Sequence, residues 1–236
     1  MKVIQPLYNR LNDLLQLFYP PICLGCQTII ELQSELSVLC ENCLHNLKRV
    51  PDNYIREEVI RRLNPCYLDN IVTIFEFDQT VQILIHEIKY RKAKKLAYRL
   101  AAYAYEQIHI AVPWQNGDLV IPVPLFRIRE KERGFNQSSA IARGFFLDSN
   151  FSLQTQIILR DRSTLSQTEL KRDERMKNVH EAFTVLQPEL IRNKNIVLVD
   201  DVVTTGATLN ECARVLKDTG VAKVWGLTLA APTKPL

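Results

Sequence analysis

The chain reads VLVDDVVTTGATL over residues 197–209, and this stretch decides the fold. An apolar, β-branched run ends in two adjacent carboxylates, Asp200 and Asp201, and a turn rich in threonine and glycine then leads into a helical pattern. Adjacent carboxylates can accept hydrogen bonds from the two vicinal hydroxyls of a ribose. The turn directs backbone N–H groups and hydroxyls toward a phosphate at the positive end of the helix. The order therefore predicts a strand, a loop and a helix that together bind a ribose phosphate.

Each half of this stretch also has an ordinary structural explanation. Apolar strands often end in aspartate, and threonine–glycine turns are common where helices begin. Either half alone would be read as local structure. The complete ordered combination favours ribose-phosphate recognition, because several separate requirements are met at once.

Strand and helix patterns alternate along the chain. Strands are expected at residues 71–77, 119–123, 157–159 and 221–229, and helices at about 80–107, 134–147 and 206–219, the first of them capped by residues 78–80. This alternation predicts an α/β fold with a mainly parallel sheet and helices on both faces. Such sheets bind ligands at the carboxyl ends of their strands, which is where Asp200 lies.

Two further polar segments come after predicted strands. In residues 121–138, prolines close a strand and four cations follow: Arg127, Arg129, Lys131 and Arg133. Arginine binds diphosphate oxygens in pairs, so this segment suits a pyrophosphate, although a charged surface loop is the alternative. Residues 160–183 are long, polar and basic on balance, which is typical of a lid or of a disordered loop.

Four cysteines form two CxxC pairs, Cys23 with Cys26 and Cys40 with Cys43. Each pair places two thiolates on one tight turn, so two turns can surround a structural Zn²⁺ with four sulfur atoms. Two disulfides or a redox pair are the alternatives, and His45 is a less favoured ligand. Cys66 and Cys212 receive no chemical role.

The composition is that of an ordinary globular protein. The chain has 236 residues, of which 47% are hydrophobic and 24% charged, and a formal net charge of +4. It has no apolar run long enough to span a membrane, and residues 1–20 predict an amphipathic helix rather than a secretion signal, so we expect a cytoplasmic protein. Six lysines and arginines between His86 and Arg99 form either a solvated helix face or a phosphate or nucleic-acid contact.

The motifs together resemble the ComF/GntX family of competence-associated, phosphoribosyltransferase-like proteins. The resemblance covers nearly the whole chain. It includes the two CxxC pairs, IKY at 88–90, IPVPL at 121–125, RGFNQS at 133–138, the spaced residues Arg160, Thr164, Gln167 and Leu170, then Arg175, Asn178, Ala182 and Phe183, and the stretch 197–209. It implies a type I phosphoribosyltransferase fold, zinc on the four cysteines and a role in DNA uptake during natural transformation.

The resemblance also implies roles for particular residues. Asp200 and Asp201 would hold the ribose of phosphoribosyl pyrophosphate (PRPP), and the loop residues Val202, Val203, Thr204, Thr205, Gly206, Ala207 and Thr208 would complete its binding site. The pyrophosphate and lid residues would be Arg127, Arg129, Arg133, Asn136, Gln137, Arg160, Thr164, Gln167 and Arg175. We take Asp200, Asp201, Arg133 and Lys89 as the catalytic candidates, with Mg²⁺ arriving together with PRPP.

We therefore expect an N-terminal helix and zinc module over residues 1–66 and a phosphoribosyltransferase-like domain over residues 67–236. The expected function is PRPP binding in DNA uptake, with DNA-uptake and recombination proteins as partners. Single-stranded DNA would bind through the zinc module or residues 89–99. The alternatives are an active phosphoribosyltransferase in nucleotide metabolism and a PRPP-responsive regulator. The N-terminal module shows no recognisable base pocket, so the acceptor stays open.

Overall fold

The computed structural model describes residues 20–30, 36–51, 53–106, 114–115, 118–147, 150–161 and 181–233. The chain divides into two compact units, Met1–Leu47 and Lys48–Leu236. This division falls earlier than the domain boundary expected after residue 66. The reason is that Val50, Ile55 and Val59 are buried in the core of the second unit.

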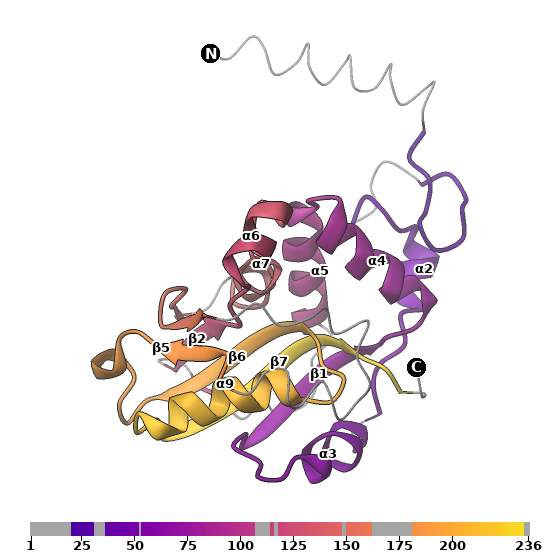
Figure 1. The fold of residues 1–236 in the computed structure, drawn as a ribbon. Helices are drawn as coiled ribbons and strands as arrows, with labels where there is room; N and C mark the ends of the chain where they lie inside the picture. Colours follow the sequence, from indigo (N-terminus) through magenta and orange to yellow (C-terminus); the bar gives the residue numbers. More distant parts are fainter. Residues whose placement is uncertain are drawn as a thin grey trace, which may run out of the picture. The chain divides into compact units, whose positions relative to one another are not determined.

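A five-stranded parallel sheet forms the centre of the second unit (Figure 1). Its strands follow the order β1 (Asn70–Glu76), β7 (Lys223–Ala231), β6 (Asn195–Val202), β2 (Leu119–Pro122) and β3 (Ser152–Leu153). Every adjacent pair is parallel, and β6 is the middle strand, paired with β7 on one side and β2 on the other. A separate antiparallel pair consists of β4 (Ile158–Arg160) and β5 (Phe183–Val185). The predicted α/β class with a mainly parallel sheet is confirmed.

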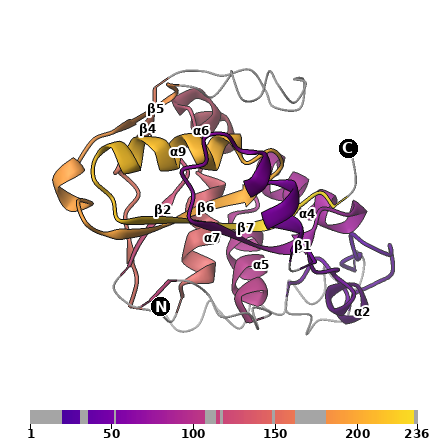
Figure 2. The same cartoon turned by 90° about the horizontal axis from the view of Figure 1, so that it is seen from below.

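Helices cover both faces of this sheet, as the sequence predicts (Figures 1 and 2). On one face, α7 (Gln137–Phe145) contacts β6 and β2, and α5 (Lys94–Glu106) packs against α7. The two helices approach closely at Gly144, where a Cβ atom would lie 2.1 Å from the carbonyl oxygen of Tyr98. On the opposite face, α9 (Ala207–Asp218) contacts β6 and β7. The short α3 (Tyr54–Glu58) contacts β1, and α2 (Glu41–His45) belongs to the first unit.

Two predicted helices differ from the observed ones. The single helix expected over residues 80–107 is wrong, because α4 (Gln79–Tyr90) ends before a turn in which Lys92 takes a φ of 56°. The expected cap is confirmed, since Asp78 accepts a hydrogen bond from the backbone N–H of Val81. The loop expected before residue 134 contains a further helix, α6 (Arg127–Arg133), which ends at Gly134 in the left-handed conformation. For this reason α7 begins at Gln137 rather than at residue 134.

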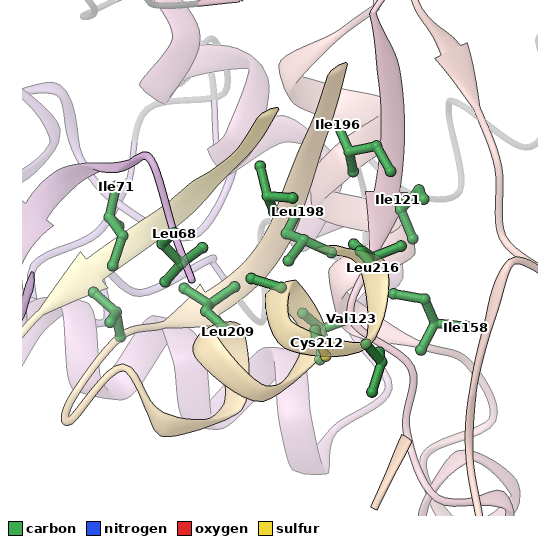
Figure 3. Packing of buried hydrophobic residues seen from close by; sticks show 14 of the residues in the cluster. Leu68, Ile71, Ile121, Val123, Ile158, Ile196, Leu198, Leu209, Cys212 and Leu216 are labelled. Atoms are coloured by element: carbon green, nitrogen blue, oxygen red, sulfur yellow. The ribbon is translucent and has the colours of Figure 1, made fainter. Parts of the chain in front are cut away.

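The core between the sheet and α9 fixes the position of the strand that carries the two aspartates (Figure 3). Ile196 and Leu198 of β6 pack with Leu209, Cys212 and Leu216 of α9. All five side chains are at least 98% buried, and each such burial contributes about 1.5–3 kcal/mol for a residue of the size of leucine. Among the described residues, no helix has both the length and the apolar character needed to cross a membrane.

Candidate ribose-phosphate site

The loop between β6 and α9 forms a hollow at the carboxyl end of the sheet. Gly206 is the N-cap of α9 and has a φ of 77°, which only glycine adopts without strain. A Cβ atom there would also lie 2.8 Å from Val59. Asp200 and residues 202–209 line the hollow, which is therefore placed at the positive end of a twelve-residue helix. The residues predicted to bind phosphate are brought together around one cavity.

Asp200 lies half-buried beside this hollow. Its Oδ1 accepts hydrogen bonds from the Ser138 hydroxyl and from the backbone N–H of Asp201, both at 2.9 Å. Burial, followed by the negative charge of Asp201, raises the pKa of Asp200 from 3.8 to about 7. The two hydrogen bonds and the charge of Lys89 lower this pKa, but they do not offset the burial. The Asp200 carboxyl thus changes its charge near neutral pH.

Asp201 is more deeply buried, with 5% of its surface exposed. Its Oδ2 receives the Lys89 ammonium at 2.8 Å and the Gln137 amide nitrogen at 3.4 Å. Its Oδ1 accepts the backbone N–H of Val202 at 2.8 Å. Residues from α4, α7 and β6 therefore meet at a single carboxylate.

The predicted pyrophosphate residues are only partly gathered at this site. The Arg133 guanidinium lies over the Tyr90 ring at 5.9 Å, so the end of α6 adjoins the end of α4. Arg127 and Arg129 are exposed on α6. Asn136 holds local structure, because its side chain donates to the carbonyl of Val123 and caps α7.

The predicted lid falls mostly outside the described residues, and this includes Thr164, Gln167 and Arg175. Arg160, at its start, lies over the Phe183 ring at 5.5 Å. Burial lowers the pKa of its guanidinium from the usual value.

Sequence reasoning missed Ser138 as a site residue. It belongs to the RGFNQS motif, yet only the observed start of α7 brings its hydroxyl to Asp200. Its place in the RGFNQS motif, in a segment that connects a predicted strand to a predicted helix, is the signal that could have identified it.

In the first unit, the four cysteines form a compact sulfur cluster. Their Sγ atoms all lie within 4.8 Å of one another, and those of Cys26 and Cys40 are 3.6 Å apart. Four sulfurs around one Zn²⁺ would lie about 3.8 Å apart, given a Zn–S distance of about 2.3 Å. Backbone N–H groups of Cys40 and Cys43 donate to the sulfurs of Cys23 and Cys40. None of the four cysteines forms a disulfide, and His45 is not part of the described cluster. The four sulfur atoms could hold a metal ion.

The phosphoribosyl transferase domain family matches residues 82–234, which include both aspartates and the loop. Competence protein F of Haemophilus influenzae is 28% identical over 89% of this chain and 90% of its own length. The DNA utilization protein YhgH of Salmonella typhimurium is 31% identical over 66% of this chain and 70% of its own. Competence protein ComFC of Bacillus subtilis is 36% identical over 44% of this chain and 40% of its own.

The fold, the loop site and these matches define a phosphoribosyltransferase-type protein. The chain belongs to the phosphoribosyl transferase domain family and, within it, to the ComF family of competence proteins. The family assignment drawn from the sequence motifs is thereby confirmed.

The raised pKa of Asp200 predicts how Asp200→Asn changes stability with pH. In the unfolded chain this carboxyl ionises near pH 3.9, whereas in the folded chain it ionises near pH 7. The folded state therefore holds the extra proton between these values, and its stability falls as the pH rises through that window. Asp200→Asn removes this cost. Its free energy of unfolding, relative to wild type, should rise from pH 5 to pH 7 and level off above pH 7.

Urea denaturation of wild type and Asp200→Asn at pH 5, 6, 7 and 8 measures the difference between their free energies of unfolding. The other titrating groups are the same in both proteins, so their contributions cancel in this difference. A difference that is constant over the whole range would contradict the assignment.

Proposed function

We propose that this chain is a PRPP-binding, phosphoribosyltransferase-like protein of the cytoplasm that acts in DNA uptake. The hollow at the end of β6 carries the proposal, because it combines the Asp200 carboxylate with the Thr/Gly loop at the start of α9. Two of the similar proteins are named as competence proteins and one as a DNA utilization protein, which supports a role in handling DNA.

The geometry supports a defined orientation of PRPP. The 5′-phosphate would take the backbone N–H groups and hydroxyls of residues 203–208, and the ribose hydroxyls would donate to carboxylate oxygen at the end of β6. The diphosphate, at the other end of the ribose, would meet the cations Lys89 and Arg133. A carboxylate beside a diphosphate site is the donor set that suits Mg²⁺, which would neutralise diphosphate charge when bound.

We expect Asp200→Asn/Asp201→Asn to abolish PRPP binding, because both hydrogen-bond acceptors lose their charge. Isothermal titration calorimetry with PRPP and Mg²⁺ measures the loss. The matched control is Asp218→Asn, an exposed carboxylate at the far end of α9, which should bind as wild type does. Wild-type affinity in the double variant would refute the site. Pyrophosphate release from PRPP in the presence of added nucleophiles, such as nucleobases and amines, distinguishes an active transferase from a PRPP-responsive binder, because the transfer needs an acceptor for the phosphoribosyl group.

We also propose that the four-cysteine cluster binds structural zinc. Thiolate sulfur is a preferred zinc ligand, and four of them leave no coordination position for a substrate. The backbone N–H groups that point at the sulfurs would stabilise their negative charge. Such a zinc would stabilise the fold of the first unit rather than take part in a reaction.

Metal analysis of the purified chain should give about one zinc per molecule, as four-thiolate sites hold one ion. Cys23→Ser should lose this zinc, because it removes one of four ligands. Cys66→Ser is the control, since Cys66 is a free thiol outside the cluster, and it should retain zinc. Equal zinc content in the two variants would contradict the proposal.

Single-stranded DNA is the second candidate ligand, and the turn between α4 and α5 favours it. Tyr90 is 58% exposed, and the Arg91 side chain is 74% exposed. Lys92, Lys94 and Lys95 are exposed beside them. An exposed aromatic ring among cations is the combination that holds stacked bases and a phosphate backbone.

Lys92→Gln/Lys94→Gln/Lys95→Gln should weaken binding of a labelled oligonucleotide and reduce its dependence on salt. Each lost phosphate contact lowers the slope of log affinity against log salt by about 0.7. Fluorescence anisotropy at two or more salt concentrations measures both effects. The matched control, Arg192→Gln/Lys194→Gln/Lys223→Gln, removes three exposed cations near the amino ends of β6 and β7. The idea fails if the two triple variants bind alike.

A further inference from the structure

The two adjacent aspartates differ in their surroundings. Consecutive residues of a strand point to opposite faces of the sheet. Asp200 shares its face with Ile196 and Leu198, which pack toward α9, and it lines the hollow with residues 202–209. Asp201 lies outside that lining, and its side-chain partners are Lys89 of α4 and Gln137 of α7, whereas the side-chain partner of Asp200 is Ser138 of α7.

The two carboxylates also differ in the capacity they have left for a ligand. Both oxygens of Asp201 already accept hydrogen bonds, Oδ1 from Val202 and Oδ2 from Lys89 and Gln137. Asp200 uses only Oδ1, for Ser138 and the N–H of Asp201. Within the described part of the chain, its Oδ2 has no hydrogen-bond partner. A ribose hydroxyl therefore finds an unused oxygen on Asp200, whereas both oxygens of Asp201 already accept hydrogen bonds and the residue is only 5% exposed.

We propose that the two aspartates have different tasks: Asp200 binds the ribose hydroxyls, and Asp201 is a positioning residue that fixes Lys89 for the diphosphate end of PRPP. This inference rests on the proposed PRPP function. The family resemblance assigns ribose binding to both aspartates, whereas this inference assigns it to Asp200 alone.

The position of Lys89 matches the shape of the ligand. PRPP carries its two anionic groups at opposite ends of one ribose ring. The loop that suits the 5′-phosphate lies on the Asp200 side of β6, so the diphosphate falls on the other side, where Lys89 comes from α4. An ammonium has three N–H donors, of which Asp201 takes one at 2.8 Å. The Lys89 side chain is 24% exposed, so its remaining donors can reach a ligand.

The residues near Lys89 also favour the diphosphate as its ligand. Tyr90 follows it and contacts Arg133, and a Cβ atom at Gly134, just past α6, would lie 3.8 Å from the Lys92 side chain. These contacts place the basic helix α6 next to the end of α4. A diphosphate held by Lys89 would therefore lie close to further cations.

Gln137 holds the same arrangement from α7. It is 4% exposed, and its amide nitrogen contacts Asp201. Within the described residues, its buried Oε1 has no hydrogen-bond partner. An unpaired buried acceptor costs about 1–3 kcal/mol, so a polar group arriving with the ligand would stabilise this corner of the site.

The test separates the two ends of PRPP. Full-length wild type, Asp200→Asn, Asp201→Asn, Lys89→Met and Lys89→Met/Asp201→Asn are titrated with Mg²⁺–PRPP, ribose 5-phosphate and Mg²⁺–pyrophosphate. Asp200→Asn should weaken ribose 5-phosphate binding about tenfold or more and leave pyrophosphate binding within about twofold. Asp201→Asn and Lys89→Met should weaken pyrophosphate binding about tenfold or more and leave ribose 5-phosphate binding within about twofold. Lys89→Met/Asp201→Asn should bind pyrophosphate no more weakly than Lys89→Met alone, because both substitutions act through the ion pair between Lys89 and Asp201.

Lys89→Arg is the conservative variant, and by keeping the charge it should restore part of the pyrophosphate affinity. If Asp201→Asn does not fold, as judged by thermal unfolding, Lys89→Met alone decides the matter. A purely structural ion pair would leave its pyrophosphate affinity unchanged, and that result overturns the inference. Loss of ribose 5-phosphate binding in Asp201→Asn, equal to that in Asp200→Asn, overturns it as well. Failure of wild type to bind PRPP would instead refute the proposed function.

Discussion

The burial of β6 on both faces is the constraint on which the rest of the structure depends. Ile196 and Leu198 pack against α9, and the alternate residues Val197 and Val199 are fully buried as well. Pairing with β7 and β2 satisfies the backbone of β6 along both edges. A strand fixed in this way cannot slip by one residue without exchanging its two faces. The two residues at its carboxyl end are therefore held in a defined orientation.

This orientation gives the site two different sides. Asp200 lines the hollow at the start of α9 and accepts the Ser138 hydroxyl of α7, whereas Asp201 is held by Lys89 of α4 and Gln137 of α7. In the proposed binding mode, the 5′-phosphate lies at the loop before α9 and the diphosphate lies near Lys89. The same burial that holds Asp200 in place also raises its pKa, so its charge depends on pH near neutrality.

Local patterns predicted the strand–loop–helix at residues 197–209, the parallel sheet and the close grouping of the four cysteines. The evidence for each was local: the residue order at 197–209, the alternation of strand and helix patterns, and the spacing within each CxxC pair. Local patterns failed at residues 91–93 and 127–133 for a physical reason. The helical periodicity of 80–107 continues across a turn that Lys92 makes at positive φ, and charge alone does not distinguish a solvated loop from the surface helix α6.

The sequence by itself determined that two adjacent carboxylates would stand at the end of a buried strand, before a loop rich in threonine and glycine. Only the tertiary structure decided that they are unequal. Lys89 and Ser138 reach Asp201 and Asp200 from helices distant in the chain, and their contacts depend on how α4 and α7 pack on the sheet. Hydrogen bonds of this kind leave no local pattern in a sequence, because the packing of whole elements brings their partners together.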